Sequence, residues 1–404
     1  MFHKITSKIL LIKRSHAIFY AIVLLASILF LLIGNAVSGQ AGIGALAQEQ
    51  AHKVVQARVT HIISRTEDTF EFSIYDIATA VDIIFLAEIT HGDLRGQIVT
   101  AEQSLGSLTM FEDKEVEVGD RILLGYGGDW TENYFFMNYV RFNTLVALAI
   151  IFFLLVVLFG GIKGFNALVS LGFIGAAIFV VLVPAILSGR NIYATTIIVS
   201  IFAILSTLCI VVGPNKKTLT AVLGCLGGVF LAGGLMAVMD IILGLTGMFD
   251  SETVALLMLP TQVPINLNAI IFASVIIGAV GAIMDVALSM STSLWEIKLA
   301  SDKPNFKTLF KSGVNIGRDI LGTMLNTLVL AYLGSSLVLV LLLVANSNSF
   351  AELINWEMII VEILRALVGS FGMLLTIPLT AGICAWAYTS ASHGPRTVKF
   401  DNDE

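Results

Sequence analysis

Long apolar runs, separated by short polar links, make up most of this chain. The first apolar run covers residues 17–33. Seven more follow a polar segment, at residues 143–160, 166–187, 192–212, 219–246, 267–290, 320–344 and 357–388. Most of them reach the ~20 residues that a helix needs to cross the hydrocarbon core of a bilayer. The pattern predicts a polytopic, mostly α-helical membrane protein with about eight transmembrane helices in a lipid bilayer.

The polar segment between the first two runs, residues 35–141, shows the alternation of strands rather than the period of helices. Its apolar stretches are bounded by Gly, Asp and Thr, and they lie at residues 54–63, 69–77, 81–89, 96–105 and 115–126. Within the last of these stretches, Gly119 and Asp120 make a turn before the final strand, as is common where a small β-barrel closes. Residues 35–140 carry 16 acidic residues but six basic ones. We therefore predict a small, acidic, β-rich domain.

The distribution of Lys and Arg predicts the topology. Four basic residues precede the first run, which we interpret as a signal anchor; a long signal peptide cleaved near residues 36–38 is the alternative. The short outer links hold only Arg190. The inner links are basic, with Lys163, Lys216, Lys217, Lys298, Lys303, Lys307, Lys311, Arg318, Arg396 and Lys399. By the positive-inside rule both termini are cytoplasmic and the β-rich domain is extracytoplasmic.

This topology divides the chain into four parts. A cytoplasmic tail and the first helix occupy residues 1–34, and the outer domain occupies 35–141. A seven-helix membrane domain follows at 142–390, and a second cytoplasmic tail at 391–404.

The sequence contains no motif of a soluble enzyme, a nucleotide-binding protein or a zinc site. It lacks GxxxxGK[ST], GxSxG, HExxH and CxxC. An intramembrane protease with two aspartates would need Asp240 and Asp285 at one depth, whereas the topology places them toward opposite ends of their helices. We expect no enzymatic activity, no cofactor and no nucleic-acid partner, and the sequence leaves open whether a metal binds.

One carboxylate is unusual within the membrane part. Asp285 lies in GAIMDVALSMSTSLWEI, residues 281–297, toward the end of a long apolar run. At about 100° per residue, it shares a helix face about 120° wide with five other residues. These are Gly278, Gly281, Ser289, Ser293 and Glu296. They form a predicted polar stripe, which we call the α-stripe of residues 278–296.

The next helix carries a second stripe. Its members lie within about 60° of one another and are Asn315, Asp319, Gly322 and Asn326. The two helices are antiparallel and joined by a short basic link, so Asp285 and Asn326 reach a similar depth. We expect the stripes to face each other, with Glu296 near Asn315 and Asp319 at the inner surface.

These stripes have a structural and a functional interpretation. Small and polar residues are typical of helix contacts in membranes, because they allow close approach and hydrogen bonds. That explanation suits the glycines and serines of the stripes, which are Gly278, Gly281, Ser289, Ser293 and Gly322. It does not explain Asp285. A carboxylate in hydrocarbon is costly, and no Lys or Arg in a neighbouring apolar run lies deep enough to neutralise it. We expect Asp285 to be protonated, to bind a cation or to face water.

Other polar features have simpler interpretations. The glycine-rich stretch 224–234 favours tight packing over a broken helix. Asp240 is interpreted as an exposed helix end, and Glu362 and Arg365 are spaced to pair with each other. Asp319 is either part of the site or a helix-end ion pair with Arg318.

Three stretches resemble the YibE/F family of bacterial membrane proteins. They are KKTLTAVLGCLGG (216–228), GAIMDVALSMSTSLWE (281–296) and GVNIGRDILGTMLNTLVLAYLG (313–334). The likeness extends over about residues 143–390, and more loosely over GDLRGQ and VEVGDRILL in the polar segment. The resemblance implies a multi-pass protein of a bacterial cell membrane, and it implies no particular activity.

Two functions fit this pattern. The first is a transporter or permease for a small solute or ion, coupled to H⁺ or a cation through Asp285. The second is a non-transporting scaffold or accessory subunit whose outer β-domain binds a partner. The protein partner expected is a second copy of the chain or a paralogous membrane subunit. A cavity reaching Asp285 would favour the first, and Asp285 sealed against hydroxyl or backbone groups would favour the second.

Overall fold

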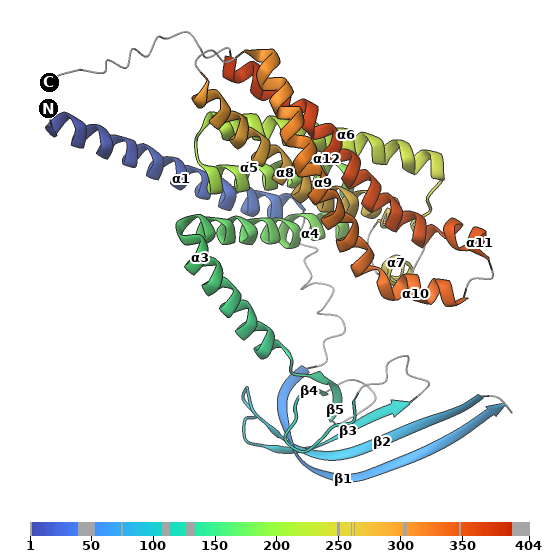
Figure 1. Cartoon of the computed structure of the whole chain (residues 1–404). Coiled ribbons are helices and arrows are strands. Elements are labelled where there is room, and N and C mark those ends of the chain that lie inside the picture. Colours follow the sequence, from blue (N-terminus) through green and yellow to red (C-terminus); the bar gives the residue numbers. More distant parts are fainter. Residues whose placement is uncertain are drawn as a thin grey trace, which may run out of the picture. The chain divides into compact units, whose positions relative to one another are not determined.

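The computed structural model describes residues 2–38, 53–73, 76–106, 114–126, 134–248, 251–259, 261, 263–301, 305–346 and 349–389. The expected cytoplasmic tail at residues 391–404 lies outside the described residues. The chain forms two compact units, of which Gly44–Phe159 is one and Met1–Ile43 with Gly160–Glu404 is the other. The first contains the strands and the second is helical (Figure 1). The prediction of a mostly helical protein with a small β-domain is confirmed.

The strands described in the first unit form a closed barrel in the order β1-β2-β3-β5-β4. Their bounds are β1 Lys53–Ser73, β2 Asp76–Ile89, β3 Ile98–Gly106, β4 Arg121–Tyr126 and β5 Tyr134–Tyr139. Neighbours are antiparallel except for β3 and β5, which are parallel. Because side chains alternate along a strand, residues such as Val59, Phe85 and Ile122 point inward and are fully buried.

The strands depart from the prediction in two places. β1 runs for 21 residues and joins most of two stretches that were predicted as separate strands. It stays extended because β2 pairs with it almost to its end, with Glu71 opposite Ile77. The strand expected to close the domain, β4, is followed by β5, which pairs with both β4 and β3 and so completes the barrel. The turn predicted before β4 is present, and Gly119 there has a φ of 100°.

The helical unit contains most of the remaining elements. They are α1 Phe2–Ser38, α4 Val183–Leu187, α5 Ile192–Val212, α6 Lys216–Leu243, α7 Ser251–Leu257, α8 Leu267–Ala300, α9 Phe306–Ser335, α10 Leu337–Asn346, α11 Phe350–Asn355 and α12 Glu357–Thr389. The boundary between the units in the chain falls within α3, Phe142–Ala177, which continues through a π-helical segment, Ile178–Leu182, into α4.

By length and composition, 6 helices of the described residues could cross a membrane, or 7 if the bent pair of α9 and α10 is one span. One of them is the 46-residue stretch Phe142–Leu187. At 1.5 Å per residue this stretch is about 70 Å long, more than twice the ~30 Å hydrocarbon core. Gly161 breaks its helical conformation, with φ 54° and ψ −138°, where the sequence predicts a link. The number of about eight spans stays a prediction.

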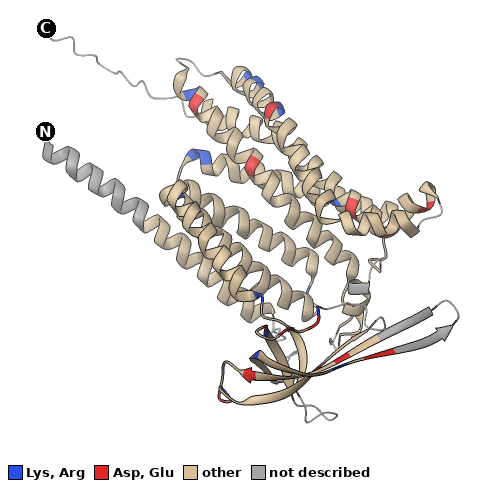
Figure 2. Ribbon diagram, turned by 60° about the horizontal axis from the view of Figure 1, so that its bottom comes forward, with Lys and Arg blue, Asp and Glu red and all other residues tan. Residues whose placement is uncertain are grey.

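The core of the helical unit lies among α6, α8 and α12. Gly224 and Gly228 of α6 face Thr380 and Thr376 of α12, and the space at each glycine is too small for a Cβ. α6 continues through both glycines as one helix, so the predicted packing role of this stretch is confirmed. Figure 2 shows long stretches of these helices without charged residues. This is the pattern that a membrane core requires.

Candidate functional site

Asp285 lies near the middle of α8, a helix of 34 residues. The helix begins at Leu267 because the Asn266 side chain caps it, accepting a hydrogen bond from the Ala269 N–H. On the opposite faces, Ile283 and Val286 are fully buried in the core, whereas Asp285 is exposed. Among the described residues, no side chain or backbone group forms a hydrogen bond or an ion pair with the Asp285 carboxylate. Asp285 is therefore not sealed against a hydroxyl group.

The other members of the α-stripe of residues 278–296 have mixed environments. Ser289 and Ser293 are half-buried, and Gly281 has no heavy atom within 4 Å of the position that a Cβ would take. Gly278 lies against the Tyr332 hydroxyl of α9, so the predicted packing role suits this glycine and not Gly281. Glu296 Oε1 accepts a hydrogen bond from Lys217 Nζ of α6 at 2.8 Å.

Glu296 has an ionic partner that the sequence did not predict. Lys217, in the first turn of α6, pairs with this carboxylate, and the expected grouping of Glu296 with Asn315 and Asp319 stays a prediction. The physical reason for the ion pair is charge: a lysine ammonium neutralises the carboxylate, whereas an amide or a second carboxylate does not.

The α9 stripe lies on the side of its helix away from the packed face. Its four members, Asn315, Asp319, Gly322 and Asn326, are all exposed. The packed face carries Gly313 and Gly317, which are buried against Ala381 and Ile377 of α12. At Gly322 a Cβ would meet no heavy atom within 4 Å, so this glycine is not a helix contact within the chain. No hydrogen bond joins the two stripes in the described part of the chain, and their facing each other stays a prediction.

A cavity of about 780 Å³ opens on the same side of α8 as Asp285. From α8 it is lined by Leu288, Thr292 and Trp295. Thr292 lies within about 20° of Asp285 around the helix and about 10 Å along it. The remaining lining residues are Lys163, Val211, Val212, Pro214, Asn215, Lys216 and Lys217. The lining ends at Leu288, about one turn short of Asp285. Two of its three lysines, Lys163 and Lys216, have no ion pair among the described residues and make the cavity electropositive.

A buried cluster of hydroxyl groups joins α6, α8 and α12, and the stripe pattern missed it. Ser291 Oγ lies 2.7 Å from Thr220 Oγ1 and 2.9 Å from the Tyr388 hydroxyl, and it donates to the Lys217 carbonyl at 2.8 Å. All three hydroxyl-bearing residues are buried. No local signal identifies Ser291, because its partners lie 71 and 97 residues away in the chain.

The apolar helices α9 and α10 are bent against each other, and a charged pair lies at the bend. The two helices meet at 60°. Ser336, at the bend, donates a hydrogen bond to Glu362 Oε2 at 2.7 Å, and Glu362 also pairs with Arg365 one turn further along α12. The predicted Glu362–Arg365 pair is thus confirmed. Interrupted spans of this kind are found where membrane carriers hold their ligands.

The described residues contain no group of three His, Cys, Asp or Glu side chains that could hold a metal ion. Within this part of the chain, a cation at Asp285 would have one carboxylate ligand and would otherwise depend on hydroxyl, amide or water oxygens.

Comparison with known proteins adds a family assignment for the membrane part. A family model described as YibE/F-like protein matches residues 148–390. The match spans α8 and α9 completely and reaches to the end of α12. No curated protein and no solved structure matches the chain.

Proposed function

The chain belongs to the YibE/F family, and we propose that it acts as a membrane transporter or permease for a small solute or ion. Asp285 is the group proposed to carry the coupling ion, H⁺ or a cation. The polar residues proposed to line the path are Ser289, Ser293, Asn315, Asp319 and Asn326. Glu296 belongs to the proposal only as the partner that holds Lys217 at the cavity. The proposal includes no enzymatic step and no cofactor.

The observation that carries this proposal is an exposed, unpaired carboxylate in the middle of an apolar helix. Leaving a charge in hydrocarbon costs several kcal/mol, so the exposed face of α8 must meet water, a proton or a partner chain. The cavity that reaches Leu288 on the same side of the helix supports a water-accessible path. The broken span of α9 and α10 supports the same class of protein.

The charges around the cavity favour a proton over a metal as the coupling ion. Lys163 and Lys216 line the cavity, and within the described residues neither forms an ion pair. Clefts lined by one sign of charge concentrate ions of the opposite sign. An electropositive approach therefore favours an anionic solute and disfavours a metal cation, whereas a proton reaches a carboxylate through water.

The proposal places the protein in the bacterial cell membrane with both termini in the cytoplasm. The break at Gly161 supports two spans within Phe142–Leu187, which together with α9–α10 as one span brings the proposed total to about eight. The barrel is then extracytoplasmic, and the lysine-lined cavity opens at the cytoplasmic side.

Labelling with a hydrophobic carbodiimide tests the role of Asp285. Such reagents modify protonated carboxyl groups inside membranes. In the reconstituted full-length protein we expect labelling of Asp285, found by peptide mass spectrometry, that declines as the pH rises. With liposomes that contain a pH-sensitive dye, Asp285→Asn should lower solute-driven proton uptake by at least about tenfold.

Glu352→Gln is the matched control, because it removes one exposed carboxylate from α11, outside the proposed path. This variant should keep the labelling of Asp285. The proposal is wrong if wild-type Asp285 resists the reagent at every pH, or if Asp285→Asn keeps full activity while folding normally.

The alternative is a non-transporting scaffold or accessory subunit, and the exposed polar face of α9 favours it. Asn315 and Asn326 lie opposite the packed face of their helix, and a second copy or a paralogous membrane subunit would give them hydrogen-bond partners. Under this alternative Asp285→Asn leaves the phenotype intact, while Asn326→Leu disrupts co-purification of the partner.

A further inference from the structure

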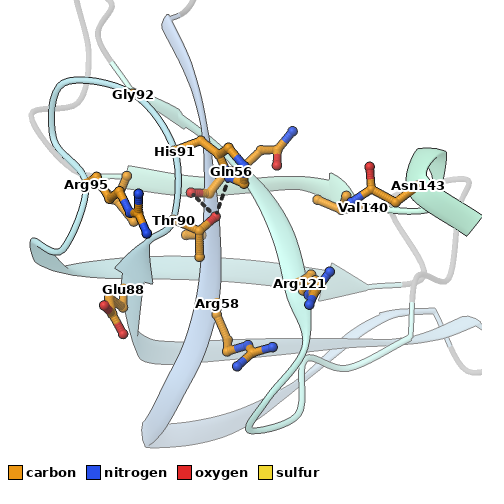
Figure 3. Close-up of a pocket in the computed structure, with 12 residues that line it drawn as sticks. Gln56, Arg58, Glu88, Thr90, His91, Gly92, Arg95, Arg121, Val140 and Asn143 are labelled. Carbon is orange, nitrogen blue, oxygen red and sulfur yellow. Dashed lines mark hydrogen bonds between the residues drawn. The ribbon is translucent and has the colours of Figure 1, made fainter.

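A polar cavity of about 630 Å³ opens on the surface of the barrel, where its arginines are exposed, and it has no part in the proposed transport path. Three arginines line it, and each comes from a different element: Arg58 from β1, Arg95 from the loop after β2, and Arg121 from β4. Figure 3 shows Arg95 and Arg121 on opposite sides of Thr90, with Arg58 below it. Glu88 and His91 also line this cavity, which we call the arginine cavity.

Two of these arginines are direct cross-strand neighbours. β1 and β4 pair in antiparallel register, with Arg58 opposite Arg121. Like charges directly opposite each other destabilise a sheet, so this pair is unfavourable unless an anion lies nearby. On its other side Arg58 is opposite Glu88 of β2, yet no ion pair forms between these two side chains in the described residues. The register therefore concentrates positive charge at one place on the barrel.

The loop that carries Arg95 has a defined conformation. Gly92 and Gly96 have φ values of 92° and 86°, a conformation that favours glycine, and the Gly96 N–H donates to the Ile89 carbonyl at 2.8 Å. At the base of the loop, both the backbone N–H and the hydroxyl of Thr90 donate to the Gln56 carbonyl, at 2.8 and 3.1 Å. Arg95 is thereby held at the rim of the cavity instead of on a free loop.

The positive charge of this cavity is unusual because residues 35–140 are acidic, with 16 carboxylates against six basic residues. Two other basic side chains of the barrel unit, Arg65 and Lys114, are neutralised by carboxylates. Arg65 pairs with Glu67 and Glu115 at 3.0 and 2.9 Å, and it holds the pKa of Glu115 below its usual range. Lys114 pairs with Glu117 at 3.2 Å. The three arginines of the cavity form no ion pair with any described residue, although carboxylates outnumber them in the same unit.

We propose that the arginine cavity binds an anionic ligand through a phosphate group. A guanidinium presents parallel N–H donors that match two oxygens of a phosphate, and the opposed Arg58 and Arg121 can share one tetrahedral group. Arg95 and the Thr90–His91 edge then face the rest of the ligand. The volume is that of a small-molecule site. The ligand is either a soluble phosphorylated compound or the phosphate headgroup of an anionic lipid.

Binding by the full-length protein in a neutral detergent tests this proposal. Inorganic phosphate and pyrophosphate should raise the melting temperature of the barrel and give a saturable signal in calorimetry. Glycerophosphoglycerol, the soluble headgroup of an anionic lipid, distinguishes the sources. Stronger binding of it than of pyrophosphate identifies a lipid headgroup, and the reverse order identifies a soluble compound.

Arg58→Gln and Arg121→Gln should each weaken phosphate binding at least about tenfold, as expected when one of two charge-assisted partners is lost. Arg65→Gln is the matched control, since it removes the same charge from β1 outside the cavity and should leave binding unchanged. Without phosphate, Arg58→Gln should melt no lower than wild type, because it relieves the repulsion from Arg121. The proposal is overturned if no phosphate compound binds, or if all three variants bind as wild type does.

Discussion

Ser289 and Ser291 stand two positions apart on α8 and have different roles. Ser291 is fully buried and contacts Thr220 and Tyr388, whereas Ser289 is half-buried and forms no hydrogen bond within the described residues. We expect Ser291→Ala to lower the free energy of unfolding by about 1–3 kcal/mol, because it leaves buried partners unsatisfied. Ser289→Ala should change it by less than about 0.5 kcal/mol. Denaturation in mixed detergent micelles measures both, and equal losses would contradict the assignment.

Single residues could be identified from the sequence where their energetic cost depends on the surrounding stretch of chain and not on distant residues. Asp285 could be identified because a carboxylate in an apolar run is costly wherever its neighbours lie. The role of Ser291 could not, since it depends on which distant helix supplies Thr220 and Tyr388. The pair of Arg58 and Arg121 could not be predicted either, because strand register depends on pairing across the barrel.

At the scale of elements, α3 offers a test of one backbone position. Gly161 has a φ of 54°, which strains any residue with a Cβ, whereas Gly160 carries no such constraint. We expect Gly161→Ala to destabilise the protein by about 1–3 kcal/mol. Gly160→Ala should be neutral or slightly stabilising, since alanine favours helix. Thermal unfolding in detergent compares them, and a stable Gly161→Ala would mean that the break is not required.

Helices were predicted more accurately than strands for a physical reason. The apolar run of 267–290 determines α8 by itself, because a membrane helix satisfies its own backbone groups. β5 was missed because its short aromatic stretch, Tyr134–Tyr139, acquires strand character from pairing with β3 and β4. The bend between α9 and α10 was also missed, since it interrupts an apolar run that continues on both sides.

For the whole molecule, the topology can be measured from cysteine accessibility. We expect a cysteine at Asp93, in the loop after β2, to react with a membrane-impermeant maleimide on intact cells. A cysteine at Lys307, in the first turn of α9, should react only after permeabilisation. The native Cys225 and Cys384 are buried and should add little background, and the half-buried Cys209 is replaced by serine in both variants. Labelling of both positions from the same side would reject the proposed topology.

The hydroxyl cluster and the glycine contacts also bear on how the protein is made. Thr220 and Ser291 are synthesised well before Tyr388, and Gly224 and Gly228 before the threonines of α12 that they face. Until α12 is synthesised, α6 and α8 therefore lie in the membrane without it. During that time Thr220 and Ser291 lack their hydrogen-bond partner, the Tyr388 hydroxyl. A ribosome that stops before residue 357 would release a chain without α12, and a membrane protease should recognise it as unfinished. A reporter fused after α12 would consequently count chains that include α12, whereas one fused at the N-terminus would also count chains that end before it.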